Sequence, residues 1–258
     1  MRNLSALAFP FFRDHPRVLS MISAFNALQR ACAISTCSLL LVLVAPAIAA
    51  AQDKSVRPGI NDSFKDPKVG QFLERFEAEG REIYELREEI VKAAGIKSGM
   101  EVADVGAGTG LFTRLFAKQV GSEGKVYAVD IAQNFLDHIA QTCKEAEITN
   151  VDPILCSQDD ARLPPESVDV IFICDTYHHF EFPQKTLASL HKALRPGGQI
   201  VLIDFHRIEG QSSEFIMGHV RAGKEVFSQE VQEAGFKLVS EETELLKDNY
   251  FIRFEKAK

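Results

Sequence analysis

From residue 101 onward, short runs rich in β-branched and aromatic residues alternate with stretches that have the spacing of amphipathic helices. The runs typical of strands are residues 101–105, 125–130, 151–156, 168–175 and 198–205, and the helical stretches are residues 111–120, 133–146 and 183–194. Residues 168–173 are almost continuously apolar, as a strand covered on both faces requires. The sequence therefore predicts an α/β fold, a doubly wound and Rossmann-like sheet that is mostly parallel with helices on both faces.

The segments on either side of this alternation have other patterns. Residues 67–94 carry apolar side chains at helical spacing with an interruption at Gly80, which predicts two helices or one bent helix, and the polar residues 52–66 are typical of a linker. After Phe205 we expect a polar loop at 209–218, a helix at 223–234, and an antiparallel strand pair formed by 236–242 and 249–256. We find no internal repeat and no second folded domain in the sequence.

Residues 1–51 form a separate unit. Their only charged side chains are Arg2, Arg13, Asp14, Arg17 and Arg30, and an uncharged run follows that ends in Ala-rich sequence. A basic start, an apolar stretch and an Ala-x-Ala ending predict a signal peptide over 1–51, cleaved after Ala49 or Ala51, and hence a periplasmic or secreted protein; Met21 is an alternative start. Cleavage leaves no stable membrane span, whereas an uncleaved segment 31–51 is long enough to anchor the chain in a membrane.

Charge and cysteine content exclude several classes of partner. The 29 Lys+Arg against 36 Asp+Glu give a net charge of −7 without a basic run, which disfavours nucleic acid as a partner. Three cysteines follow the predicted signal peptide, Cys143, Cys156 and Cys174. Their number is odd, and two of them fall on predicted strands, so we expect buried thiols and no disulfide framework. Cysteine and histidine do not cluster at zinc-ligand spacing, and we expect no metal.

The strongest local motif is the segment 102–111, where a strand ends in a Gly-rich turn that opens a helix. Gly106, Gly108 and Gly110 allow a sharp turn and a close approach of a ligand to the backbone. The dinucleotide fingerprint requires glycine three positions after Gly108, and this chain has Leu111 there. A tight turn without a ligand is the simpler interpretation of these glycines on their own.

Carboxylates stand at or just after four successive strand ends, at Asp104, Asp130, Asp160 and Asp175, and Lys and Arg are missing there. Ligands of such sheets bind at the carboxyl ends of the strands, and an acidic edge repels a pyrophosphate but attracts a cation. Asp130 has the place of an acid that accepts hydrogen bonds from ribose hydroxyls. The expected ligand is therefore a nucleoside that carries a cation. Taken singly, Asp130 is equally well a helix cap and Asp160 a loop acid.

In this order and spacing, the motifs resemble those of class I S-adenosylmethionine-dependent methyltransferases, of the small-molecule type that includes the ubiquinone and menaquinone biosynthesis enzymes. The resemblance runs from about residue 99 to 205. It implies S-adenosylmethionine as the cofactor and transfer of its methyl group to a small-molecule acceptor. It also implies one methyltransferase domain over 67–258, with 67–94 as an N-terminal helical lid.

The resemblance assigns roles to individual residues. Asp104 would face the amino group of the cofactor, Ile131 would pack on adenine beside Asp130, and Asp160 with the backbone N–H of Ala161 would read the adenine edge. The implied cofactor-binding residues are together Asp104, Gly106, Ala107, Gly108, Thr109, Gly110, Asp130, Ile131, Asp160, Ala161 and Asp175.

The acceptor side is marked by His178 and His179, which follow the fourth predicted strand. Either histidine is a candidate general base for a hydroxyl acceptor, and packing or helix capping is the alternative role. An Asn-Pro-Pro-Tyr motif is absent, which disfavours nucleic acid and glutamine substrates. Further candidates for contact with an acidic or phenolic acceptor, or for plain solvated surface, are Arg75, Arg81, Tyr84, Arg87, His206, Arg207, His219, Arg221 and Lys224.

Two other function classes compete with a methyltransferase. The export signal favours a non-catalytic S-adenosylmethionine-binding or nucleoside-binding module, because the cofactor is made in the cytosol, but the intact motif residues favour an enzyme. The glycine spacing and the acidic edge disfavour a nicotinamide-dependent oxidoreductase.

Overall fold

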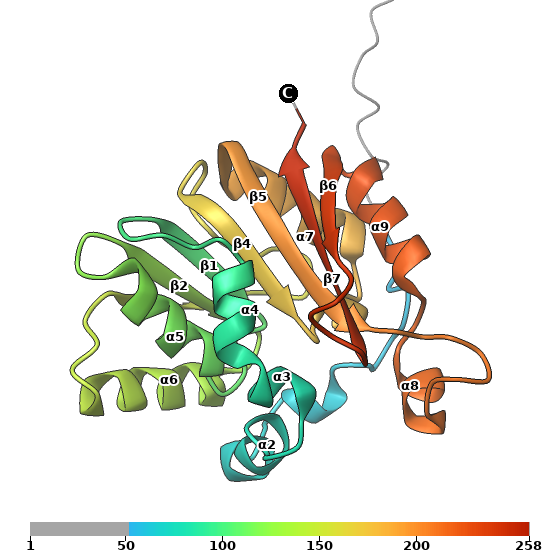
Figure 1. Ribbon diagram of the computed structural model, residues 1–258, viewed down its shortest axis with the longest axis horizontal. Coiled ribbons are helices and arrows are strands. Elements are labelled where there is room, and N and C mark those ends of the chain that lie inside the picture. The colour runs from blue at the N-terminus through green and yellow to red at the C-terminus, as the bar shows by residue number, and fades with distance from the viewer. Residues whose placement is uncertain (1–51, 258) are drawn as a thin grey trace, which may run out of the picture. The chain divides into compact units, whose positions relative to one another are not determined.

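The computed structural model describes residues 52–257, so the predicted signal peptide lies outside the described residues. Its sheet has seven strands in the order β3-β2-β1-β4-β5-β7-β6 (Figure 1). The strands are β1 (Glu101–Val105), β2 (Lys125–Asp130), β3 (Val151–Leu155), β4 (Val168–Cys174), β5 (Leu194–Phe205), β6 (Phe236–Glu242) and β7 (Asn249–Lys256). β7 is antiparallel to both β5 and β6, and the other pairs are parallel. The predicted fold class and the antiparallel C-terminal pair are confirmed.

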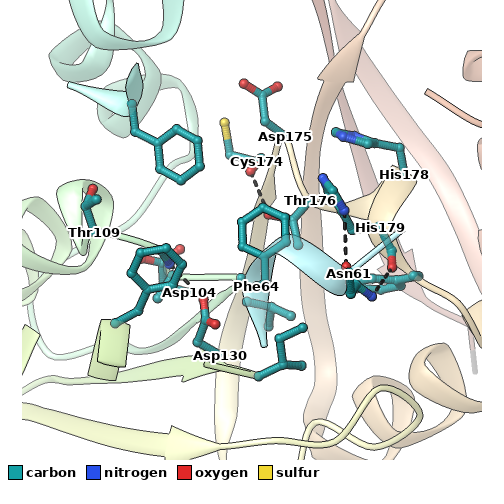
Figure 2. A pocket seen from close by; sticks show the side chains of 18 of the residues that line it. Asn61, Phe64, Asp104, Thr109, Asp130, Cys174, Asp175, Thr176, His178 and His179 are labelled. Carbon is teal, nitrogen blue, oxygen red and sulfur yellow. Dashed lines mark hydrogen bonds between the residues drawn. The ribbon is translucent and has the colours of Figure 1, made fainter. Parts of the chain in front are cut away.

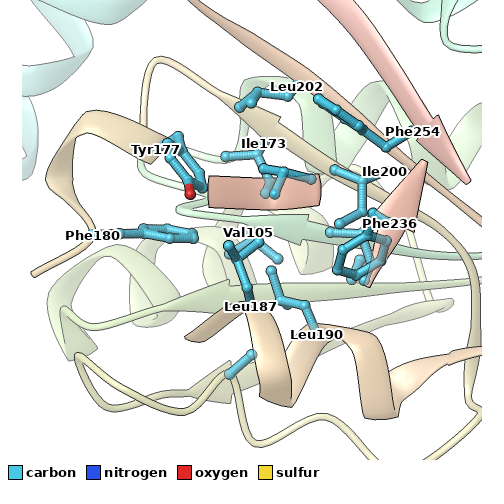
Figure 3. Close-up of a cluster of buried hydrophobic side chains, with 14 of the residues drawn as sticks. Val105, Ile173, Tyr177, Phe180, Leu187, Leu190, Ile200, Leu202, Phe236 and Phe254 are labelled. Atoms are coloured by element: carbon cyan, nitrogen blue, oxygen red, sulfur yellow. The ribbon is translucent and has the colours of Figure 1, made fainter. Parts of the chain in front are cut away.

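Helices cover both faces of the sheet because successive strand residues point to opposite sides. On one face, Val102 of β1 packs with Phe116 of α5 (Leu111–Val120), and α6 (Gln133–Glu145) and α4 (Arg87–Ala93) lie on the same side. On the other face, Val105 of β1 packs with Leu187 and Leu190 of α7 (Pro183–Ala193), and α9 (Lys224–Glu233) completes that layer (Figure 3). Because the strands are apolar on both faces, the sheet has a hydrophobic core on each side.

The N-terminal region differs in detail from the expectation. Residues 67–94 form three short helices in place of two helices or one bent helix: α2 (Val69–Phe76), α3 (Glu82–Glu85) and α4. Gly80 separates α2 from α3 with a φ of +86°, a conformation that favours glycine. Residues 52–66, interpreted as a linker, contain the 3₁₀ turn η1 (Asp62–Phe64), and the Val56 N–H donates to the Glu181 carbonyl. The polar side chains and backbone of this segment thus bond to the domain.

The expected loop at 209–218 is wrong, because it contains the start of helix α8 (Glu214–His219). The hydroxyl of Ser213 accepts a hydrogen bond from the Ile216 N–H and caps this helix, a signal that the polar composition of the segment concealed. Strand β5 also begins at Leu194, ahead of the predicted residue 198.

The topology leaves one natural place for a ligand. The chain leaves β1 toward α5 on one face and leaves β4 toward α7 on the other, and β1 and β4 are neighbours. A crevice forms where such connections diverge, at the carboxyl ends of the strands. Within residues 52–257, no helix combines the length and apolar character that crossing a membrane requires.

Candidate active site

The loop between β1 and α5 is held in a conformation that needs glycine. Gly106 has a φ of +75°, and a Cβ added to it would lie 2.2 Å from Cγ2 of Thr176. Gly110 has a φ of +79°, and its added Cβ would lie 2.6 Å from Cγ1 of Ile139. The loop therefore passes so close to neighbouring elements that neither position has room for a side chain.

Two carboxylates lie beside this loop. Asp130, at the end of β2, accepts hydrogen bonds from the N–H groups of Gly108 (2.9 Å) and Ala132 (2.8 Å). Asp104, in β1, accepts one from the hydroxyl of Thr113 (2.6 Å). Both side chains are buried, and both line the same cavity (Figure 2). Asp130 therefore positions the glycine loop and also faces the ligand site, so it is more than a helix cap.

The two carboxylates carry an electrostatic penalty. Burial raises the pKa of Asp104 to about 7 and that of Asp130 to about 6, and the Asp130 charge contributes to the shift of Asp104. Among residues 52–257, neither carboxylate has a basic side chain within ion-pair distance. A ligand with positive charge would relieve this penalty, because it favours the ionised form of both groups.

The cavity itself has a volume of about 390 Å³ and lies at the carboxyl ends of the strands. Its apolar wall is largely aromatic and includes Phe64, Phe76, Phe112, Phe135, Phe180, Phe205 and Phe215. Glu77, directly after α2, accepts a hydrogen bond from the Thr109 hydroxyl (2.8 Å) and pairs with Arg114 (3.0 Å). The N-terminal helices are therefore tied to the glycine loop and close one side of the cavity.

Most of the cofactor-binding residues predicted from the sequence line this cavity. They are Asp104, Gly106, Ala107, Gly108, Thr109, Asp130, Ile131, Ala161 and Asp175, and the predicted catalytic residues His178 and His179 line it too. Gly110 does not line the cavity but forms the left-handed residue that starts α5.

Asp160 and Ala161 do not have the arrangement that we expected. The Asp160 side chain is exposed, does not line the cavity and accepts a hydrogen bond from the Arg162 N–H at 2.7 Å. The Ala161 N–H, expected to read the adenine edge, donates to the Ser189 hydroxyl at 3.0 Å. The Asp160 carboxylate and the Ala161 N–H, which the motif assigned to adenine, therefore bond within the loop and to α7.

Asp175 reaches the cavity but its charge is already paired. Its carboxylate accepts hydrogen bonds from the Arg81 guanidinium, just before α3, and from the Asn249 amide. Burial raises the pKa of Asp175, and the Arg81 charge opposes that shift. Asp175 thus fastens the N-terminal helices to the sheet, and Asp104 and Asp130 remain the buried carboxylates of the cavity without an ion pair among residues 52–257.

The opposite side of the cavity is lined by imidazoles. His178 and His179 lie in the 3₁₀ turn η2 (Tyr177–His179) after β4, and His219 ends α8. His178 Nδ1 lies 2.8 Å from Oδ1 of Asp204, a fully buried acid near the end of β5. Burial, followed by the neighbouring histidines, lowers the pKa of His179 to about 2, and burial also lowers the pKa of His219. These two rings are therefore neutral at physiological pH.

Few of the flanking residues that the sequence suggested for contact with an acceptor reach the cavity. Of the set proposed from the sequence, Arg75, Arg81 and His219 line it. Arg221 is paired with Glu230 (2.6 Å), and Arg207 donates to the carbonyls of Val220 and Met217. Arg75 has no carboxylate within ion-pair distance in the described part of the chain.

Sequence reasoning missed Asp204, Asn61 and Phe64. Asp204 ends a strand as Asp104 and Asp130 do, and this position was the signal that could have found it. Asn61 and Phe64 belong to the segment interpreted as a linker, and no local pattern indicated that it crosses the cavity. Pairing of Asn61 with His179 depends on residues 118 positions apart.

The fold and the cavity define an α/β protein whose cavity, at the carboxyl edge of its sheet, suits a cationic nucleoside. Comparison with known proteins specifies the class further. Residues 102–198 match the family model described as a methyltransferase domain. The chain is 29% identical over 122 residues to the ubiquinone/menaquinone biosynthesis C-methyltransferase of Hydrogenovibrio crunogenus, covering 46% of this chain and 47% of that protein.

Two further comparisons agree. The demethylmenaquinone methyltransferase of Listeria welshimeri is 30% identical over 118 residues, which cover 46% of this chain and 50% of that protein. The chain thus spans about half the length of the curated relatives it matches. The crystal structure of a SAM-dependent methyltransferase from Aquifex aeolicus has the same fold, with a TM-score of 0.64, 24% identity, and coverage of 74% of this chain and 97% of that one.

Residues 102–198 therefore resemble a methyltransferase domain, and the fold is that of S-adenosylmethionine-dependent methyltransferases. The residues present fit that cofactor, which has two positive charges and a ribose. Asp104 and Asp130 are buried with no ion-pair partner among residues 52–257, and Gly106, which lines the cavity, has no room for a Cβ. S-Adenosylmethionine is thus the cofactor that this cavity is built to hold.

Proposed function

We propose that the protein transfers the methyl group of S-adenosylmethionine to a small aromatic acceptor that carries a hydroxyl or an acidic group. The observation that carries the proposal is the pair of buried carboxylates, Asp104 and Asp130, which lie beside the glycine loop and have no ion-pair partner in the described part of the chain. A cationic nucleoside removes their electrostatic penalty, and a pyrophosphate would increase it.

The cofactor, when bound, supplies a methyl group on a positively charged sulfur that a nucleophile displaces in line. The chain's contribution is to align the two reactants and to exclude water. We assign Asp130 to the nucleoside end, Asp104 to the amino group and the loop residues 106–109 to the methionine part, and the helices that precede β1 cover the cavity. Asp160 is left out of this assignment because its carboxylate is exposed.

The acceptor half of the cavity supports an aromatic substrate. Its wall is rich in phenylalanine, and Arg75 offers a positive charge without a carboxylate partner among the described residues. The names of the relatives refer to ubiquinone, menaquinone and demethylmenaquinone. A ring with a polar substituent matches both the apolar wall and the imidazoles that line the same cavity.

We assign His178 and His179 to the acceptor side of the reaction. Their rings line the cavity, and Asp204 fixes the orientation of His178 by accepting from its Nδ1–H. The His178→Ala variant is expected to lower the formation of S-adenosylhomocysteine by about 100-fold, the typical contribution of a group that activates a nucleophile. Its affinity for S-adenosylmethionine should stay unchanged.

The measurement is the rate of S-adenosylhomocysteine release with a panel of phenols and hydroquinones, alongside cofactor binding to each variant. Cofactor binding without conversion by any acceptor would favour the alternative function, a non-catalytic S-adenosylmethionine-binding module. A His178→Ala variant that turns over at the wild-type rate would remove this residue from the acceptor side.

Cofactor affinity should also depend on pH. Burial raises the pKa of Asp130 to about 6 and that of Asp104 to about 7, so both become ionised as the pH rises through this range. The affinity for S-adenosylmethionine should therefore increase by about tenfold or more between pH 5 and pH 8, since each pKa unit corresponds to a factor of ten. Calorimetry should show proton release on binding near pH 6.5.

The stability of the free protein should change with pH in the opposite direction to the cofactor affinity. A carboxyl group whose pKa is raised by folding binds protons more tightly in the native state, so its contribution to stability falls as the pH rises from 3.8 toward 6 and 7. The thermal stabilisation by S-adenosylmethionine should consequently be larger at pH 8 than at pH 5. An affinity that is flat over this range would contradict the role of both carboxylates.

We further propose that the protein is exported by residues 1–51 to the periplasm or the medium. The support is the sequence pattern of Arg30, the uncharged run after it and the Ala-x-Ala ending. The N-terminal mass of the exported chain distinguishes cleavage after Ala49 or Ala51 from an uncleaved anchor. The net charge of −7 supports the proposal that nucleic acid is not a partner.

A further inference from the structure

Three imidazoles from two distant parts of the chain converge at the acceptor end of the cavity. Ring nitrogens of His178, His179 and His219 all lie within 4.8 Å of one another. The Nε2 atoms of His179 and His219 are 3.3 Å apart. Zinc–nitrogen bonds of about 2.0–2.1 Å in a tetrahedral site place two ligating nitrogens about 3.4 Å apart. The observed separation thus equals that of two ligands of one metal ion, and in the metal-free protein it is also that of a hydrogen bond between the two rings.

The other side of two of these rings is held by a hydrogen-bond acceptor. His178 Nδ1 lies 2.8 Å from Asp204 Oδ1, and because a carboxylate only accepts, the ring must donate there. The Asn61 amide nitrogen donates to the His179 carbonyl at 3.0 Å, which turns its oxygen toward His179 Nδ1 at 3.1 Å. In the neutral rings, both Nε2 atoms therefore carry a lone pair. Metal-binding histidines are held in this way by an acid or a carbonyl oxygen.

The surroundings also favour a bound cation over simple packing. His178 Nε2 has no hydrogen-bond partner among the described residues, although its ring is almost completely buried. Phe215 stacks on His219, and Phe64 meets the ring of His179 edge-on, so both rings keep an apolar shell. All three histidines line the cavity, which leaves the remaining coordination position open toward it.

We propose that His178, His179 and His219 bind one divalent transition-metal ion of the zinc class, with Asp204 and Asn61 as positioning residues. Three histidines with one open position are the ligand set of a catalytic zinc site. No local sequence pattern indicates this site, because His219 lies 40 residues beyond His179. The binding of metal stands on this geometry alone, and its use in catalysis rests on the proposed function.

In that use, the metal would activate the acceptor. A hydroxyl that occupies the open position loses its proton to water more readily than the free hydroxyl does. Its oxygen lone pair then forms the new bond to the methyl carbon, while the carbon–sulfur bond breaks and its electron pair stays on sulfur. The products are the methylated acceptor, S-adenosylhomocysteine and one proton, so atoms and charge balance without a further reactant.

The test is calorimetric titration of the full chain with zinc chloride, without a polyhistidine tag and after removal of metals by a chelator. We expect one zinc ion per chain with a Kd of about 1 μM or below, and visible absorption of tetrahedral cobalt when Co²⁺ replaces zinc. His219→Ala should weaken zinc binding at least about 100-fold, and Asn61→Ala about tenfold, as loss of an outer partner does. His138→Ala, a matched control on α6 away from the cavity, should bind zinc as the wild type does.

Each variant is also titrated with S-adenosylmethionine, which should bind His219→Ala with wild-type affinity and thereby report an intact fold. The proposal is overturned if the wild type fails to bind zinc, or if His219→Ala and His138→Ala bind it equally well. Loss of cofactor binding with zinc binding intact would instead refute the proposed function and leave the metal site standing.

Discussion

The Gly106→Ala variant is expected to lose most of its S-adenosylmethionine affinity and to unfold at a temperature about 8 °C lower than the wild type. The residue has a φ of +75°, which costs an alanine about 1–2 kcal/mol. The new Cβ would also lie 2.2–2.8 Å from side-chain atoms of Thr176, an overlap that forces the loop or Thr176 to move. Overpacking of this kind costs about a further 1–3 kcal/mol. A loss of 1 kcal/mol lowers the unfolding temperature by about 2–4 °C in a domain of this size.

The effect on binding follows from the position of the loop. Gly106 directly precedes Ala107 and Gly108, whose backbone lines the cavity, and a displacement of about 1 Å in such a loop can cost about 100-fold in function. Calorimetry and thermal unfolding measure both effects. Gly197→Ala is the matched control, because Gly197 has a φ of +77° and nothing within 4 Å of an added Cβ. Equal effects of the two variants would show that contact with Thr176 does not matter.

The Asp130→Ala variant is expected to bind S-adenosylmethionine at least about 100-fold more weakly than the wild type. A carboxylate that accepts from both ribose hydroxyls makes two charge-assisted hydrogen bonds, each of about 1.5–3 kcal/mol, and 1.4 kcal/mol corresponds to about a factor of ten in Kd. The variant also removes the acceptor of the Gly108 and Ala132 N–H groups, which lets the glycine loop move.

Two further variants separate these causes. Asp130→Asn removes the charge but keeps one oxygen, which can accept from only one of the Gly108 and Ala132 N–H groups, so it should disturb the loop less than Asp130→Ala and still bind the cofactor more weakly. Asp137→Ala, on the exposed side of α6, should leave the affinity unchanged. Wild-type affinity in Asp130→Ala would place the nucleoside elsewhere in the cavity.

Much of the fold could be predicted because its information is local. The spacing of apolar residues along the chain defines strands and helices. The strands β1, β2, β6 and β7 and the helix α5 therefore have the predicted bounds. Other boundaries were less accurate where composition opposed the structure. The helix α8 escaped prediction because its start lies in a polar segment, and the start of β5 was hidden by Pro196, Gly197 and Gly198.

The candidate site also has a part that could be predicted from local sequence and a part that could not. The glycine loop, Asp104 and Asp130 could be predicted, because their spacing follows from the strand ends that carry them. The acceptor end depends on residues far apart in the chain, such as Asn61 with His179 and His178 with Asp204, and no local pattern records such pairs. The motif at Asp160 shows the opposite error, because a matching sequence here serves a loop turn.

The electrostatics connect stability with function. Asp104 and Asp130 are buried and form no ion pair with any residue that the structure describes, which lowers the stability of the free protein at neutral pH. A cofactor with two positive charges offsets that cost only when it is bound. The same residues therefore explain why the cavity prefers S-adenosylmethionine and why its affinity should rise with pH.

The most direct test of the account is calorimetric titration of the wild-type chain at pH 7.5 with S-adenosylmethionine and, separately, with NAD⁺. We predict binding of one S-adenosylmethionine per chain with a Kd in the micromolar range and no measurable heat with NAD⁺, whose pyrophosphate would meet the buried carboxylates. A folded protein that binds NAD⁺ more tightly, or that binds neither, would contradict the assignment of this cavity.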